Sequence, residues 1–284
     1  MQDIEEHSFT GERALFHGRD LRITHSTFAD GESPLKESRD IALHRSVFQW
    51  KYPLWYSKNI TVTDSAFLET ARSGIWYSDN ISVSNSMIEA PKTFRRAKNI
   101  TLEHVDMPLA SETLWHCDGI SLSHVTARGD YFGMNSQNVR ASDLRLSGNY
   151  AFDGAKNIEI DNATLLSKDA FWNCENVTVR DSLIVGEYLG WNSKNLTFVD
   201  CTIESLQGLC YVENLTLKNC RLINTTLAFE YSTVDADVTT VIDSVMNPSG
   251  GTIRAKGIRE LILEDTKIDP RNTTIVVTER AHAA

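Results

Sequence analysis

Residues 59–67 read Asn-Ile-Thr-Val-Thr-Asp-Ser-Ala-Phe, and close variants of this nine-residue phrase return along most of the chain. If the opening Asn is position zero, positions one, three and eight are apolar and position six is small. Successive clear copies start 19 to 21 residues apart. They begin at Asp20, Asp40, Asn59, Asn80, Asn99, Gly119, Asn138, Asn157, Asn176, Asn195 and Asn214.

A period this short and regular is typical of a solenoid, in which each unit buries its apolar face only by stacking on its neighbours. Apolar residues alternate at period two, which indicates strands rather than helices. The apolar positions hold mainly β-branched residues, which argues against a leucine-rich repeat. The phrase therefore predicts an all-β fold, a right-handed parallel β-helix of about 12–13 coils of ~19–20 residues, with degraded copies near Val241 and Leu261.

Stacked coils place like residues over like. Position eight is large, as in Phe28, Phe48 and Phe67, so we expect a continuous inward column. Position zero is usually Asn, which tolerates a left-handed backbone and can hydrogen-bond to the next coil. We interpret this Asn row as a structural ladder.

The unbroken repeat predicts one domain over residues 1–284, with an N-terminal cap at 1–10, coils over 11–270 and a C-terminal cap or tail at 271–284. The net charge of −10 disfavours nucleic acid as a partner. No stretch is long and apolar enough for a membrane span, and residues 1–6 lack a signal-peptide pattern. We expect a cytoplasmic protein with reduced cysteines and without metal or cofactor. The sequence leaves a monomer and a homo-oligomer open.

Five of the six tryptophans share one phase, four residues before position zero. Lys36 and Arg95 share that phase, so this column should face outward, because burying charges is costly. The next column, three residues before position zero, is also polar. Exposed aromatic residues in register are typical of a binding surface, and sugars are the ligand class that we expect. The predicted substrate-binding residues are Trp55, Tyr56, Trp76, Tyr77, Trp115, Asn135, Trp172, Asn173 and Trp191.

The phrases, the stacked ladders and the Trp-Tyr and Trp-His pairs resemble the pectate-lyase-like superfamily, and within it a bacterial family of unknown function. This resemblance implies the fold more strongly than an activity. Many relatives of this fold cleave acidic polysaccharides, but the polygalacturonase Asn-Thr-Asp, Asp-Asp and Gly-His-Gly elements are missing. Arg254-Ala255-Lys256 only partly matches their Arg-Ile-Lys.

The ionisable residues of the same surface predict a catalytic centre, if there is one, at Arg95, Arg96, His116 and Asp153. His116 would act as the base and Asp153 as the acid on a sugar. Three function classes stay open from the sequence. They are a carbohydrate-acting enzyme such as a hydrolase, lyase or isomerase on an oligosaccharide or sugar derivative, a non-catalytic carbohydrate-binding module, and an interaction or assembly protein in which the tryptophans form an interface or a satellite core.

Overall fold

The computed structural model describes residues 1–278. Contacts along the chain divide it into two compact units, residues 1–147 and residues from 148 onward, and each is taken by itself. Residues 279–284 of the predicted C-terminal cap lie outside the described residues, and the single-domain interpretation stays a prediction.

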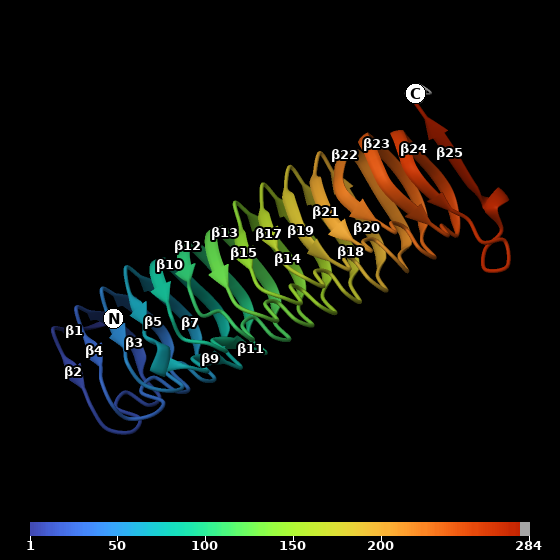
Figure 1. Ribbon diagram of the computed structural model, residues 1–284. Coiled ribbons are helices and arrows are strands. Elements are labelled where there is room, and N and C mark those ends of the chain that lie inside the picture. The colour runs from blue at the N-terminus through green and yellow to red at the C-terminus, as the bar shows by residue number, and fades with distance from the viewer. Residues whose placement is uncertain (279–284) are drawn as a thin grey trace. The chain divides into compact units, whose positions relative to one another are not determined.

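Each coil of the first unit contributes one principal strand, and these strands pair in parallel with the coil before and the coil after (Figure 1). The shared positions of the phrase stay in register, as Ile41, Ile60 and Ile81 do. The principal strands are β1 (Gln2–Glu5), β3 (Arg19–Thr24), β5 (Arg39–His44), β7 (Lys58–Thr63), β10 (Asp79–Ile88), β12 (Lys98–Met107), β13 (Asp118–Arg128) and β14 (Gln137–Ser142).

A second ladder follows the bend at position five. Its short strands are β2 (Ser8–Phe9), β4 (Thr27–Phe28), β6 (Val47–Phe48), β8 (Ala66–Phe67) and β15 (Arg145–Ser147). In β10, β12 and β13 the strand continues through the bend without a break. A third side carries the sparse pair β9 (Ile75–Trp76) and β11 (Phe94–Arg95), and the tryptophans lie on this side.

The second unit repeats the pattern, with parallel pairing between equivalent strands of successive coils. Its last coils keep the pairing but shift register near Cys220 and Val238. The strands are β16 (Lys156–Asp161), β17 (Thr164–Leu166), β18 (Glu175–Arg180), β19 (Leu183–Glu187), β20 (Lys194–Val199), β21 (Thr202–Leu206), β22 (Glu213–Thr226), β23 (Thr233–Met246), β24 (Gly250–Ile262) and β25 (Thr273–Val277).

The predicted parallel β-helix is confirmed, with about 15 stacked coils rather than 12–13. The difference arises at the two ends, which lack the phrase. Residues 1–10 form a rung, because β1 pairs with β3 and β2 with β4. Near the other end, β25 pairs with β24. Within residues 1–278 the only helices are the short 3-10 turns η1 (Glu69–Ala71) and η2 (Pro270–Asn272), and no helix there is long and apolar enough to cross a membrane.

The core consists of columns, as expected from the phrase. Phe28, Phe48 and Phe67 are buried and stack with ring centroids 4.5 and 4.6 Å apart. The small residues of position six are buried beside them, and their hydroxyls join the coils. For example, the Ser65 hydroxyl accepts a hydrogen bond from the Ser46 backbone at 3.0 Å. The stacking of the Phe rings and the hydrogen bonds of the Ser hydroxyls thus both depend on the same spacing between coils.

The Asn ladder is also present on the surface, at position zero of successive coils. In the first unit the Asn80 amide donates to Asn59 Oδ1 at 2.9 Å. In the second unit Asn195 donates to Asn176 and Asn214 donates to Asn195, both at 2.8 Å. These asparagines have positive φ, which Asn accepts at lower cost than most residues.

We predict that Phe67→Ala lowers the free energy of unfolding by roughly 3–5 kcal/mol, because it removes a fully buried ring from the stack. Urea titration measures the change. The exposed ring of Phe16 provides the control, and Phe16→Ala should cost less than about 1 kcal/mol. A loss below about 1 kcal/mol for Phe67→Ala would contradict the packing described above.

Candidate functional site

The predicted tryptophan surface of the first unit is a column of stacked planar groups. Trp55 and Trp76 lie parallel, with ring centroids 5.1 Å apart and an interplanar angle of 8°. The Arg95 guanidinium carbon lies 4.5 Å from the Trp76 ring and 4.6 Å from the Trp115 ring. Arg95 therefore takes the place that an indole would occupy in its coil, and cation–π attraction holds it there.

Backbone hydrogen bonds fix the orientation of these indoles. The ring N–H groups donate to carbonyl oxygens of the following coil: Trp55 to Ser73 at 2.5 Å, Trp76 to Lys92 at 2.7 Å and Trp115 to Tyr131 at 2.6 Å. All three side chains are half-buried. Between Trp55 and Trp115 the ring faces are covered by one another and by Arg95, so a ligand there meets ring edges rather than ring faces.

Ion pairs complete the Arg95 environment. The carboxylate of Glu112 lies 3.3 Å from Arg95 Nη2 and 3.1 Å from Lys92 Nζ. The Arg95 Nε–H is buried without an acceptor among the described residues. Arg95 is therefore held by two rings and one carboxylate, although one of its donors is unsatisfied.

The neighbouring column, on the same side of the first unit, is more exposed. Tyr56 and Tyr77 stack at 4.9 Å, and Tyr56 is 50% exposed. Arg96, His116 and Asn135 follow in the next coils, all exposed and all with positive φ. The first unit thus brings these predicted residues onto one side, in adjacent columns.

In the second unit, Trp172 donates its ring N–H to the Tyr188 carbonyl at 2.7 Å and lies 6.1 Å from Trp191. Asn173 donates to Asp153 Oδ1 at 2.8 Å. His116 belongs to the first unit and Asp153 to the second, so their assignment as an acid–base pair stays a prediction, as does the assignment of both columns to sugar binding.

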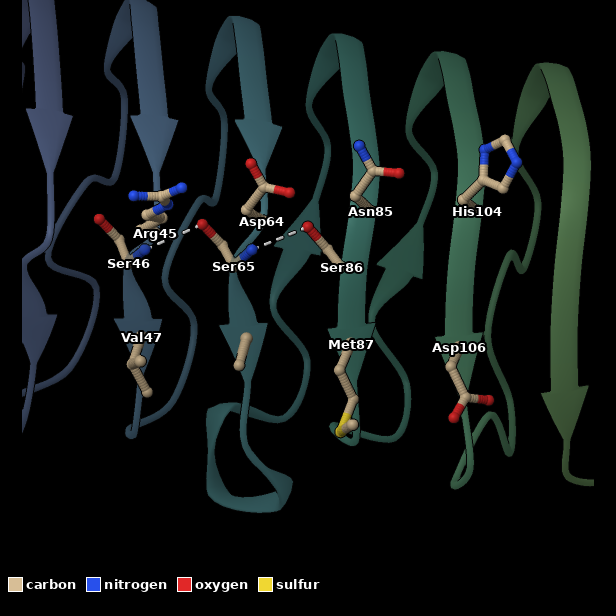
Figure 2. A pocket seen from close by; sticks show the side chains of 11 residues that line it. Arg45, Ser46, Val47, Asp64, Ser65, Asn85, Ser86, Met87, His104 and Asp106 are labelled. Carbon is tan, nitrogen blue, oxygen red and sulfur yellow. Dashed lines mark hydrogen bonds between the residues drawn. The ribbon is translucent and has the colours of Figure 1, made fainter.

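A surface that we did not predict lies at the bend between the principal and the short strands of the first unit. Here an open hollow of about 490 Å³ spans four coils. Figure 2 shows Arg45, Asp64, Asn85 and His104 in one row, from position five of successive coils. A second row comes from position seven and contains Val47, Ala66, Met87 and Asp106. We call the side chains at positions four, five and seven of this unit the bend groove, of which the hollow itself is the part lined by positions five to seven of the four coils from Arg45 to Asp106.

Every position-five residue of the bend has positive φ, but the two units fill it differently. The second unit has Asn162, Asp181, Asp200 and Asn219 at this position. Asn and Asp adopt a left-handed backbone at lower energetic cost than most other residues. The first unit also places Arg and Glu there, for which left-handed backbone costs roughly 1–2 kcal/mol. Positive φ also occurs at Arg96 in the first unit and at Phe152 and Phe171 in the second, so the choice of residues, and not the strain itself, distinguishes the first-unit bend. Its position-five residues are Glu6, His25, Arg45, Asp64, Asn85, His104, His124 and Asp143.

Four of the eight histidines lie in the bend groove, each near a carboxylate. The nitrogen-to-oxygen distances are 3.9 Å for His25 with Glu5, 3.3 Å for His44 with Asp64, 3.9 Å for His104 with Glu103 and 3.6 Å for His124 with Asp143. The rings of His104 and His124 stack at 4.6 Å. Within residues 1–278, no group of three or more His, Cys, Asp or Glu side chains is arranged to hold a metal ion.

The sequence did contain a signal for the bend groove. Position five reads Asp or Asn in several copies and His or Arg in others, which indicates a left-handed turn that also carries chemistry. The tryptophan column is a stronger pattern in the sequence, however. The sequence also does not reveal that the chain changes direction between positions four and seven.

All five cysteines are free and buried. Burial raises the pKa of Cys117 to about 12 and that of Cys201 to about 11. Thiols with raised pKa values are mainly protonated at neutral pH.

Asp169 of the second unit is a buried carboxylate beside the tryptophan side of its coil, and it is only 2% exposed. Burial raises the pKa of Asp169, while Lys168 and a hydrogen bond from Tyr150 oppose the shift. Its charged form is therefore disfavoured in the folded protein.

A family model described as "Protein of unknown function (DUF3737)" matches residues 2–276. No curated protein matches the sequence. Solved structures that resemble the fold include the A-module of the Azotobacter vinelandii mannuronan C-5 epimerase AlgE4, at 9% identity and TM-score 0.35, covering 96% of this chain and 87% of that one.

Two further structures resemble the fold. The tailspike protein of E. coli bacteriophage HK620 in complex with a pentasaccharide has 10% identity and TM-score 0.41, with 95% of this chain and 70% of that one covered. The surface adhesin PfbA of Streptococcus pneumoniae has 10% identity and TM-score 0.37, with 92% and 81% covered. At these scores the similarities do not carry an activity over to this chain.

We predict that Arg95→Met lowers the free energy of unfolding by roughly 1–2 kcal/mol, because it keeps an apolar stem between Trp76 and Trp115 but removes the cation. Urea titration of the variant measures this loss. Arg96→Met is the matched control, because Arg96 is exposed in the next column, and it should change stability by less than about 0.5 kcal/mol. A more stable Arg95→Met protein would mean that desolvation of the guanidinium outweighs its contacts.

We predict that Asp169→Asn stabilises the protein at pH 7. The raised pKa means that the folded state binds this proton more tightly than the unfolded state. The contribution of Asp169 to stability is therefore greatest below the unfolded Asp pKa of about 3.9 and is lost as pH rises through the folded value. The gain from Asn should appear at pH 7 and shrink toward pH 3 in denaturant titrations, whereas the exposed control Asp181→Asn should show no such trend. Destabilisation by Asp169→Asn at pH 7 would refute this reading.

Proposed function

We propose that this chain, which belongs to the DUF3737 family of unknown function, binds an oligosaccharide along the bend groove of its first unit. The observation that carries the proposal is the two-row lining of the hollow, with polar side chains at position five facing a mainly apolar row at position seven.

This lining matches the chemistry of a sugar ring. A pyranose has hydroxyls at its rim, which both donate and accept hydrogen bonds, and a C–H face that packs on apolar groups. The guanidinium of Arg45 donates, the carboxylate of Asp64 accepts, and the amide of Asn85 does both. Met87 is 42% exposed and offers an apolar surface beside them. A few polar groups over apolar lining are typical of ligand sites, and the volume lies in their usual range.

The hollow also holds polar groups that the protein itself does not use. Among the described residues, the side chains of Asn85 and Asp106 make no hydrogen bond or ion pair, unlike the ladder amide of Asn80, which donates to Asn59. Asn219, at the same bend position in the second unit, donates to Asp200 at 2.5 Å. The free groups of the hollow are therefore available to a ligand.

The repeat suits a chain of sugars better than a single one. Adjacent coils are spaced roughly 4.8 Å apart, which is about the length of one sugar unit in an extended oligosaccharide. Successive coils can then present Arg45, Asp64, Asn85 and His104 to successive sugars.

Other polymers fit the groove less well. A peptide strand adds to an unpaired sheet edge, but β7 is paired with β5 and β10, and β8 is paired with β6 and β10. Nucleic acid needs an excess of basic side chains, which a protein of charge −10 lacks.

The test is binding of the full chain to a panel of oligosaccharides, followed by calorimetry on those that bind. Asn85→Ala should weaken binding about tenfold or more, because it removes a donor and an acceptor from the centre of the hollow. Asn219→Ala is the matched control in the other unit and should leave the Kd unchanged.

The tryptophan side, predicted from the sequence, is the alternative location for the same ligand. Tyr56→Ala removes its most exposed ring and tests it in parallel. Binding that is lost in Tyr56→Ala but kept in Asn85→Ala would move the site to the tyrosine column. Absence of binding to every oligosaccharide would overturn the proposed function.

A further inference from the structure

The charges of the bend groove restrict which oligosaccharides it can accept. Its acidic side chains outnumber its basic ones along all of the first unit. They are Glu5, Glu6, Asp64, Glu103, Asp106 and Asp143, against the guanidinium groups of Arg45 and Arg145.

The four imidazoles do not reverse this balance. Each lies 3.3 to 3.9 Å from a carboxylate of the groove, so a proton gained by the ring is matched by a negative charge beside it. Even with every imidazole protonated, the formal charge of the groove only reaches zero. It is never positive.

The hollow itself likewise has no excess of positive charge. It contains the carboxylates of Asp64 and Asp106, the guanidinium of Arg45 and the imidazole of His104. Arg45 Nη1 also lies 3.5 Å from His25 Nε2, so one amino group of the guanidinium points toward the His25 ring rather than toward solvent. Asp106 has no cation partner among the described residues, and it would face any acidic group that a ligand brought into the hollow.

We propose that the groove selects oligosaccharides of uncharged sugars and discriminates against polyuronates and sulfated chains. This inference rests on the proposed function and concerns the same site. Its physical basis is electrostatic: a carboxylated sugar entering the hollow would lose hydration near unpaired negative charge, whereas a hydroxyl can donate to the same carboxylates.

The test uses oligosaccharides that differ only in charge. β-1,4-linked mannose hexamer and its mannuronate counterpart form one pair, and glucose and glucuronate hexamers form a second. With the full chain at pH 7 and low salt, we expect the uncharged member of whichever pair binds to bind at least tenfold more tightly. The difference should shrink as salt is added, because screening weakens the repulsion.

A charge-neutralising variant distinguishes electrostatics from shape. The double substitution Asp64→Asn and Asp106→Asn should reduce the preference for the uncharged member at least threefold. The control, Asp181→Asn with Asp200→Asn, removes two carboxylates from position five of the second unit and should leave the preference unchanged.

Each outcome has one meaning. Equal or tighter binding of the uronate member overturns the charge selectivity while leaving oligosaccharide binding intact. An unchanged preference in the Asp64 and Asp106 variant also overturns it, because the discrimination would then not come from the hollow. If neither member of either pair binds, and no other oligosaccharide of the panel does, the proposed function itself fails.

Discussion

Parallel pairing of each coil with the next is the constraint on which the rest of each unit depends. It fixes a residue of one coil directly over its equivalent in the next, so every position of the phrase becomes a column. A column of phenylalanines can stack in the core, and a column of asparagines can pass hydrogen bonds from coil to coil. Like charges in neighbouring coils repel, and a neutral or oppositely charged group between them relieves the repulsion, as Asp79 does between Lys58 and Lys98. The Trp76–Arg95–Trp115 stack is a solution of this kind, because a planar cation takes the place of an indole.

The sequence predicts the columns because alternation at period two determines which residues point inward. Phe67 and Ser65 therefore lie where the phrase places them, both buried. The phrase does not reveal the end rungs, because strands such as β1 and β25 are held by pairing with a neighbour rather than by their own pattern. The number of coils was underestimated for this reason.

The candidate site was harder to predict for a different physical reason. Alternation places Trp55 and Trp76 outside the core, but it does not determine how their rings turn. The indole N–H groups find carbonyl acceptors in the next coil, and satisfying them lays the rings against each other with their faces covered. Ring orientation depends on those contacts between coils, which a linear sequence does not display. The bend groove, in turn, lies where the left-handed residue at position five changes the direction of the chain between the principal and the short strands.

The left-handed position of the bend is filled by different residues in the two units. Asn and Asp fill it at low backbone cost, and the second unit uses only these residues in its regular coils, from Asn162 to Asn219. The first unit accepts the strain of Arg45 and keeps Asn85 outside any ladder. This difference between the units supports the proposed location of the ligand site at the first-unit bend. It does not depend on any similarity to other proteins.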